Sequence, residues 1–194
     1  MKIINQNPSL TETFVVSETV RRLQEEGTVV MMPVAGVYAL VCRWNDKAAK
    51  DKIYKLKKSR TFQIFFWDTK DMPSSGLMFS KEARKLAVAL CPALLTIIDT
   101  EGAGAAFAIP PEGIFFQKIV EEAGSPLAVI SAGKDAVSPD NAISKLYGQP
   151  DYIIDRGTLP SEEKIATIVE ISGKSIKIIR EGDVSESAIR KVLS

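Results

Sequence analysis

The sequence predicts an α/β fold in which helices flank a twisted, open sheet of mixed parallel and antiparallel strands. Three observations predict it. Helical and extended patterns alternate early in the chain, whereas extended segments pair with one another late in the chain. The 194 residues are 45% apolar and 25% charged, which is typical of one globular unit with a sizeable core. There is no internal repeat or low-complexity linker, so we expect a single domain over residues 1–194.

The chain is expected to begin with a helix and a strand. The helix is expected over residues 17–26, because Ser17 can cap its start and Gly27 its end. An apolar strand follows over residues 28–32. Small residues at 34–36 then predict a turn after that strand.

A basic helix and a buried strand come next. Ala49, Ile53 and Leu56 recur at i, i+4 and i+7, so we expect an amphipathic helix over residues 46–57. Its lysines mostly fall on the other face, which we expect to be solvated. The aromatic run over residues 62–67 predicts a strand buried in the core.

The middle of the chain predicts a helix and two strands. Ser80 can cap a helix that runs to residue 90, and Pro92 ends it. Strands are expected over residues 94–98 and 106–109, on either side of a glycine-rich turn at 101–105.

The last part of the chain is expected to add three helices and four strands. Gly124-Ser125-Pro126 ends the first of these helices, and serines can cap the other two. In order, the expected elements are a helix at 114–123, a strand at 127–130, a short helix at 138–147, strands at 152–155, 166–171 and 175–179, and a helix capped by Ser185.

Charge and composition exclude several classes of function. The net charge of +1 gives no overall attraction to nucleic acid or anionic lipid, so a contact with a polyanion needs a local patch. The chain has neither an apolar run that could span a bilayer nor a secretory signal, so we expect a cytoplasmic protein without a membrane partner. Its two cysteines lack metal-ligand spacing and are expected to be buried, reduced thiols. The absence of histidine excludes Ser-His and Cys-His nucleophiles.

A Lys-x-Arg pair, Lys58-Ser59-Arg60, follows the basic helix. If the chain is extended there, both side chains leave the same face and can converge on one anion. A strand and tight turn beside such a pair is one way in which α/β proteins build a phosphate pocket. The alternative is that the pair is simply the solvated basic end of the helix.

Seven segments between residue 33 and residue 182 form one ordered pattern. They are Pro33-Val34-Ala35-Gly36-Val37-Tyr38-Ala39-Leu40, Lys58-Ser59-Arg60, Cys91-Pro92-Ala93-Leu94-Leu95-Thr96, Ala108-Ile109-Pro110, Ser131-Ala132-Gly133, Ala166-Thr167-Ile168-Val169-Glu170 and Ile179-Arg180-Glu181-Gly182. In this order, and at compatible spacings, they resemble segments of the YrdC-type family, whose active members are threonylcarbamoyl-AMP synthases. The resemblance runs from about Ser17 to the C-terminus.

The resemblance implies a YrdC-like domain with a concave cleft and a nucleotidyltransferase activity. Such enzymes combine threonine, bicarbonate and ATP, release pyrophosphate, and make the adenylate used for threonylcarbamoyladenosine in tRNA. Magnesium is then expected to be bound through the phosphates rather than in a metal site of the protein. Several members have been described as binding double-stranded RNA, so tRNA or double-stranded RNA is a further expected partner.

The resemblance also implies site residues. Lys58 and Arg60 are expected to act on the triphosphate as catalytic residues. The expected nucleotide-binding residues are Lys58, Arg60, Ser131 and Arg180. The expected substrate pocket contains Tyr38, Thr96 and Thr167. The alternatives are that Thr96 and Thr167 are only strand formers, that Arg180 is an edge-strand charge and that Ser131 is only part of a loop.

Five positions depart from the family pattern, and all of them lose polarity. Val34, Ala35, Ala108, Gly133 and Ala166 stand where the family has Thr, Asp or Glu, Arg, Asn and Ser. A charge-assisted hydrogen bond contributes ~1.5–3 kcal/mol, so losing the arginine at position 108 alone would weaken threonine binding by roughly one to two powers of ten. Two hypotheses follow: a threonylcarbamoyl-AMP synthase-like enzyme with an altered amino-acid substrate, or a catalytically inactive relative that binds nucleotide or double-stranded RNA. A wholly structural role ranks third.

Overall fold

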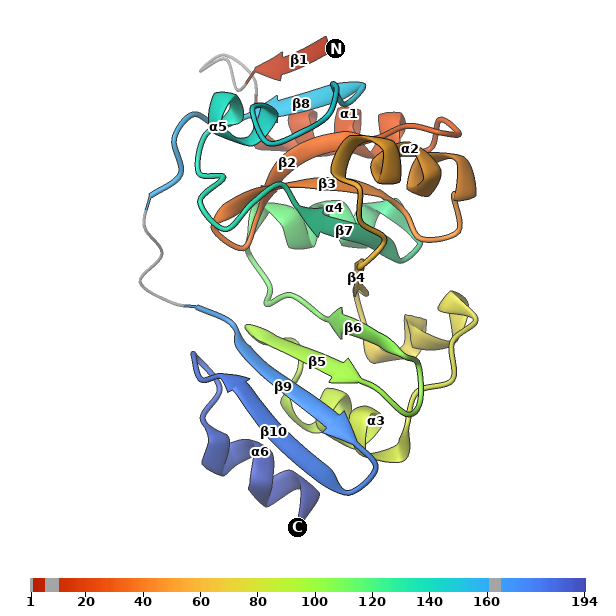
Figure 1. The fold of residues 1–194 in the computed structure, drawn as a ribbon, viewed down its shortest axis with the longest axis vertical. Coiled ribbons are helices and arrows are strands. Elements are labelled where there is room, and N and C mark those ends of the chain that lie inside the picture. Colours follow the sequence, from red (N-terminus) through yellow and green to blue (C-terminus); the bar gives the residue numbers. More distant parts are fainter. Residues whose placement is uncertain (1, 6–10, 161–164) are drawn as a thin grey trace.

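The computed structural model of the chain describes residues 2–5, 11–160 and 165–194. Ten strands form one sheet (Figure 1). In chain order they are β1 (Lys2–Asn5), β2 (Val30–Val34), β3 (Val37–Arg43), β4 (Gln63–Phe65), β5 (Leu95–Asp99), β6 (Ala105–Ala108), β7 (Leu127–Ser131), β8 (Tyr152–Asp155), β9 (Thr167–Ser172) and β10 (Ser175–Arg180). Across the sheet the order is β1-β8-β2-β3-β7-β4-β6-β5-β9-β10.

Helices join most of these strands. They are α1 (Glu12–Leu23), α2 (Lys47–Lys57), the 3-10 helix η1 (Thr69–Ser75), α3 (Lys81–Leu90), α4 (Phe115–Ala123), α5 (Pro139–Ile143) and α6 (Glu186–Leu193). Four strand pairs are parallel, β1 with β8, β2 with β8, β4 with β6 and β5 with β9, and the others are antiparallel. The expected mixed, open α/β sheet flanked by helices is therefore confirmed.

Serine caps explain why two helices begin where the sequence predicts. The hydroxyl oxygen of Ser80 accepts a hydrogen bond from the backbone N–H of Ala83, and Ser185 does the same for Ala188. The prediction for the first helix was wrong at its start, because Thr11 rather than Ser17 caps α1. Two further strands, β1 and β3, were not assigned from the sequence. The short helix α5 also ends at Ile143, before the expected residue 147.

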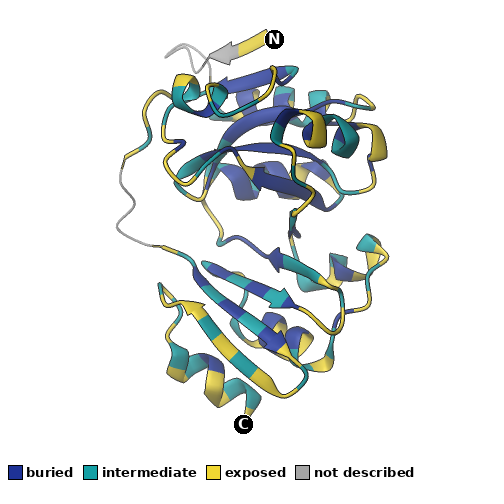
Figure 2. Cartoon of the chain, in the orientation of Figure 1, coloured by how far each residue is buried: buried dark blue, intermediate teal, exposed yellow. Residues whose placement is uncertain are grey.

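The first half of the sheet is covered on both faces. Helices α1 and α4 pack on one face in a core that includes Val16, Met32 and Phe116. Helix α2 packs on the other face with Ile53 against Leu40 and neighbouring residues. Both faces of β2, β3 and β7 are consequently buried, as Figure 2 shows by their dark colour.

The second half of the sheet is covered on one face only. Helices η1, α3 and α6 bury residues such as Phe107, Ile97 and Val169. Their strand neighbours Thr96 and Ile168, which point to the opposite face, are only half-buried. Figure 2 shows the resulting alternation of colour along β9 and β10. We call this uncovered side of β4, β6, β5, β9 and β10 the open sheet face.

Both cysteines are free thiols; Cys42 is buried and Cys91 is half-buried. Within the described ranges, no helix combines the length and the apolar character that crossing a membrane requires.

Candidate functional site

The start of β3, just after the β2–β3 turn, is joined to the loop after β7 by backbone hydrogen bonds. The N–H of Ala132 donates to the carbonyl oxygen of Tyr38 over 2.9 Å, and the N–H of Tyr38 donates to the carbonyl oxygen of Ala136 over 2.7 Å. In the turn itself, Ala35 and Gly36 have positive φ values of 48° and 81°. Two of the segments that the sequence singled out are therefore held together at one end of their strands.

Ser131 forms a tight turn at the end of β7. Its hydroxyl oxygen accepts a hydrogen bond from the N–H of Gly133 over 3.1 Å and donates one to the carbonyl oxygen of Gly133 over 2.9 Å. The residue is exposed, and it pairs with Ala39 of β3. An exposed hydroxyl at the carboxyl end of a central strand lies where open α/β sheets place their ligands.

Two lysines that the sequence did not single out reach this loop. The ammonium group of Lys57, in the last turn of α2, donates to the carbonyl oxygen of Ala132. The ammonium group of Lys145 lies 2.8 Å from a carboxylate oxygen of Asp135. Burial, and then the nearby charge of Lys145, lowers the pKa of Lys57. Nothing in the sequence pattern marks Lys145, because only the folded chain brings it to the loop.

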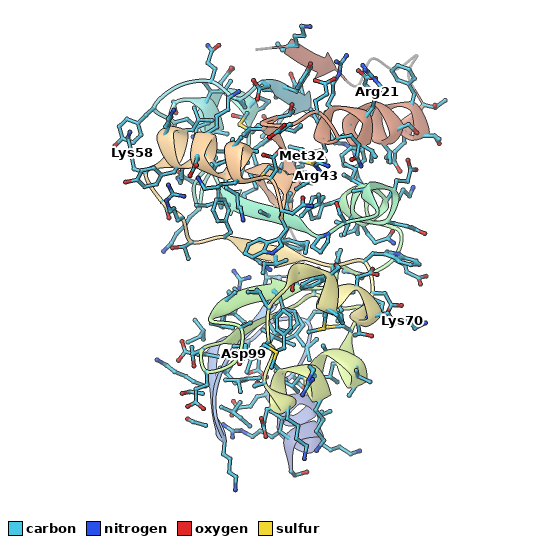
Figure 3. All side chains as sticks on the ribbon, turned by 90° about the vertical axis from the view of Figure 1, so that its right-hand side faces the viewer. Arg21, Met32, Arg43, Lys58, Lys70 and Asp99 are labelled. Atoms are coloured by element: carbon cyan, nitrogen blue, oxygen red, sulfur yellow. The ribbon has the colours of Figure 1, made fainter. Side chains whose placement is uncertain are left out.

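Lys58 and Arg60 point to different partners. Lys58 follows α2 in the left-handed conformation, with φ 56°, and its ammonium nitrogen lies 5.6 Å from the centre of the Tyr147 ring. Arg60 contacts Asp51 through a 2.9 Å ion pair and lies over the ring of Tyr54. The condition for both side chains to leave one face, an extended chain, is therefore not met at Lys58. Figure 3 shows Lys58 at the end of α2, directed away from the sheet.

Tyr38 is fully buried, and its hydroxyl group is bonded within the protein. It donates to the carbonyl oxygen of Gly157 over 2.9 Å and accepts a hydrogen bond from the N–H of Arg156 over 3.0 Å. Burial raises the pKa of this phenol. The geometry gives Tyr38 a structural bond between β3 and the segment after β8.

The other three predicted residues lie on β5, β9 and β10. Thr96 is on the open sheet face, where its hydroxyl oxygen accepts a 2.9 Å hydrogen bond from the side-chain amide of Gln63. Thr167 points to the covered face and is fully buried. Its hydroxyl group donates to Val184 over 2.6 Å. Arg180 is exposed and donates to the carbonyl oxygen of Ala166 over 2.9 Å.

Two of the positions that depart from the family pattern belong to one apolar cluster. Val34 and Ala108 are 5% and 6% exposed, and they pack in the same core as Phe65 and Phe116. Ala108 lies between Phe65 and Thr96 across the sheet. The open sheet face thus begins at an apolar boundary, and the Gln63–Thr96 pair supplies polar groups next to it.

The structure also bears on metal binding. Among the residues that the structure describes, no three His, Cys, Asp or Glu side chains gather in a group that could hold a metal ion. Around the loop after β7 the structure places the hydroxyl group of Ser131 and the ammonium groups of Lys57 and Lys145, with one exposed carboxylate, Asp135, paired to Lys145. These groups suit an anion better than a cation.

Comparison with solved structures shows where this fold occurs. The crystal structure of P. abyssi Sua5 complexed with L-threonine is 22% identical to this chain, with a TM-score of 0.72, and the match covers 99% of this chain and 61% of that chain. E. coli YciO is 20% identical with a TM-score of 0.70, and there the match covers 97% of this chain and 98% of that chain. Full-length HypF, solved in a phosphate- and nucleotide-bound form, is 14% identical with a TM-score of 0.63, and there the match covers 90% of this chain and 29% of that chain.

This chain therefore spans about three fifths of the length of the Sua5 chain. No curated protein matches the sequence. The family model Sua5_yciO_yrdC, described as "Telomere recombination", matches residues 22–182. Because this match includes most of the sequence and the fold agrees with it, the chain belongs to the Sua5/YciO/YrdC family.

Proposed function

We propose that the chain binds ATP with its phosphates at the Ser131–Gly133 turn and forms an adenylate in the manner of threonylcarbamoyl-AMP synthases. The observation that carries the proposal is the exposed Ser131 turn, which lies at the carboxyl end of β7 and is bonded to the β2–β3 hairpin through Tyr38. The phosphate- and nucleotide-bound form of HypF supports the nucleotide part of the proposal, and the L-threonine complex of Sua5 supports an amino acid as the second substrate.

The reaction requires a carbamate to attack the α-phosphate of ATP with pyrophosphate as the leaving group. Both reactants are anions, so the site must neutralise charge and hold the reactants in line. Lys58 and Arg60 are proposed to do this after their side chains rotate from Tyr147 and Asp51. Arg60 can take two phosphate oxygens, whereas Lys58 supplies a point charge. Magnesium would be held by the phosphates, and Arg180 is proposed as a further nucleotide contact.

The amino-acid substrate is proposed to differ from threonine or to be bound differently. Val34 and Ala108 offer only apolar surface to a ligand. On the open sheet face, the Gln63 amide nitrogen donates to the Thr96 hydroxyl oxygen. The amide oxygen of Gln63 and the hydroxyl hydrogen of Thr96 can therefore contact an amino-acid ligand there. The proposed product is the adenylate used to form threonylcarbamoyladenosine in tRNA, or a close analogue of it.

A pyrophosphate-release assay tests the proposal. The full chain is incubated with ATP, magnesium and bicarbonate, and each of the twenty amino acids is added in turn. We expect release that depends on one amino acid and on bicarbonate, and that is lost in Lys58→Ala and in Arg60→Ala. Lys55→Ala is the matched control, because Lys55 is exposed on the same helix. If no amino acid supports release, the catalytic proposal fails.

A second candidate function is binding without turnover. It is favoured by the loss of polar side chains at the five positions that depart from the family pattern and by the contacts that occupy Lys58 and Arg60. This function predicts that ATP or double-stranded RNA binds without pyrophosphate release. For RNA, the logarithm of the affinity should fall linearly with the logarithm of the salt concentration.

A further inference from the structure

The Ser131–Gly133 turn is covered on one side by the side chain of Lys145. If Gly133 carried a Cβ atom, that atom would lie 2.6 Å from the Cδ atom and 3.1 Å from the Cε atom of Lys145. A side chain at position 133, such as the asparagine of the family's Ser-Ala-Asn segment, would require the Lys145 side chain to move. The glycine therefore makes room for the lysine, whose methylene groups lie directly against the backbone of the turn.

Lys57 approaches the same turn from α2. Its ammonium group donates to the carbonyl oxygen of Ala132, the middle residue of the turn. In the described part of the chain, Lys57 has no carboxylate partner. Lys145 has one, Asp135, whose side chain is 73% exposed. Burial and, after it, the charge of Lys145 lower the pKa of Lys57.

Two lysines thus reach one turn, and among the described ion pairs only Lys145 has a carboxylate partner there, the solvent-exposed Asp135. Both lysines are half-buried, and like charges at one partly buried turn cost free energy that a bound anion would recover. The turn adds the hydroxyl group of Ser131, which can reorient from Gly133 toward a ligand. A phosphate group matches this set, because it accepts several hydrogen bonds and carries more than one negative charge.

We propose that Lys57 and Lys145 bind a phosphate group of the nucleotide at the Ser131–Gly133 turn. This inference rests on the proposed function and deepens it, because it assigns the phosphate contacts to two lysines outside the Lys-x-Arg pair. Lys145 supplies from outside the turn a polar group that Gly133 itself lacks. Lys58 and Arg60 are then left for the phosphates farther from the turn.

Isothermal titration calorimetry with the full chain tests this assignment. The variants are Lys57→Met and Lys145→Met, in which methionine keeps much of the apolar stem and removes the charge. The matched control is Lys55→Met, on the exposed side of the same helix. The probes are ATP with magnesium, inorganic pyrophosphate, inorganic phosphate and adenosine. Thermal unfolding of each variant shows whether it is folded.

We expect each of the two variants to weaken ATP and pyrophosphate binding about tenfold or more, which corresponds to one lost charge-assisted contact. Adenosine binding and the Lys55→Met control should be unchanged. Gly133→Ala should also weaken pyrophosphate binding, because its Cβ displaces Lys145. If a variant has lowered thermal stability, its pyrophosphate affinity is divided by its own adenosine affinity. This ratio should still be about tenfold lower than in the wild type.

The outcomes separate this inference from the proposed function. If the wild-type chain binds ATP and the affinity is the same in Lys57→Met and Lys145→Met, the assignment of the two lysines is overturned and the proposed function stands. If the wild-type chain binds neither ATP nor pyrophosphate, the nucleotide site itself is overturned. Binding of inorganic phosphate alone, without ATP, would also contradict the assignment to a nucleotide.

Discussion

The phenol of Tyr38 donates a hydrogen bond to the carbonyl oxygen of Gly157 over 2.9 Å. The phenol oxygen of Tyr38 also accepts a hydrogen bond from the N–H of Arg156. These bonds join the start of β3 to the segment that leaves β8, across more than a hundred residues of sequence. Because the backbone of Tyr38 also holds the loop after β7, one residue positions three segments around the candidate site.

Tyr38→Phe should lower the stability of the protein. The phenylalanine ring fills the same space, but the backbone groups of Arg156 and Gly157 lose their partner. These bonds are only partly buried, so their loss should cost about 0.5–1.5 kcal/mol, as for an ordinary hydrogen bond. Urea unfolding at equilibrium measures this difference. An unchanged midpoint would contradict the structural role of the hydroxyl group.

Thr167→Val should also be destabilising. The hydroxyl group of Thr167 donates to the carbonyl oxygen of Val184 and accepts hydrogen bonds from the N–H groups of Gly182 and Val184. Valine keeps the shape and the strand preference, so the expected loss of ~1–3 kcal/mol comes from the unpaired backbone groups. Thr96→Val is a comparison, since Thr96 is half-buried on the open sheet face. The measurement is the urea midpoint, and equal midpoints for Thr167→Val and the wild type would refute the prediction.

Local patterns predicted most elements of this fold but not the geometry around the site. The caps at Ser80 and Ser185 follow from rules that involve a few neighbouring residues. In contrast, Lys58 occupies the left-handed position at which helices usually end with glycine, and no sequence rule predicts a lysine there. Because Lys58 is left-handed rather than extended, its side chain leaves the backbone in a different direction from the one that an extended chain would give.

Residues brought together by tertiary structure were also missed. Lys57 is adjacent to the predicted pair, yet its contact with Ala132 depends on how α2 packs on β3 and β7. Lys145 lies far along the chain, and its place over Gly133 depends on the short helix α5. Charge patterns along the sequence identify surface lysines, whereas the fold decides which of them meet.

The two cysteines should not react with thiol reagents in the folded protein. Burial raises the pKa of Cys42 to about 12 and that of Cys91 to about 11. The thiolate is the reactive form, and at pH 8 only about one Cys91 thiol in a thousand would be ionised. Ellman's reagent at pH 8 should therefore label neither cysteine quickly, and both after unfolding in urea. Rapid labelling of the native protein would contradict this expectation.

Stability should depend on pH through Glu18. Hydrogen bonds from Arg21, and then from Arg22, lower the pKa of Glu18 from 4.5 to about 2. The pKa of Glu18 is lower in the folded state than in the unfolded state. The contribution of Glu18 to the free energy of unfolding is therefore full above about pH 4.5 and is lost as the pH falls to about 2. Glu18→Gln should cost up to ~1 kcal/mol at pH 7, as exposed ion pairs do.

The cost of Glu18→Gln should shrink toward zero at pH 2. Urea midpoints of the variant and the wild type at several pH values measure it. Glu26→Gln is the control, because Glu26 is exposed and has no ion pair in the described part of the chain. A cost that stays constant down to pH 2 would rule out the ion pairs as its source.

Asp51→Asn should strengthen ATP binding if Arg60 binds the triphosphate. Asp51 holds Arg60 by a 2.9 Å ion pair, and hydrogen bonds from Lys47 and Arg60 lower the pKa of this carboxyl group. In the free protein Asp51 therefore competes with phosphate for the guanidinium group. An exposed ion pair contributes ~0.2–1 kcal/mol, so removing it should raise the affinity by up to about fivefold.

A double-mutant cycle separates this effect from a general change in charge. In the Arg60→Gln background, Asp51→Asn no longer releases a guanidinium group, so the gain in ATP affinity should disappear. A gain of equal size in both backgrounds would mean that the Asp51 charge acts on ATP without Arg60. A loss of affinity in Asp51→Asn alone would mean that the ion pair positions Arg60 for the nucleotide rather than competing with it.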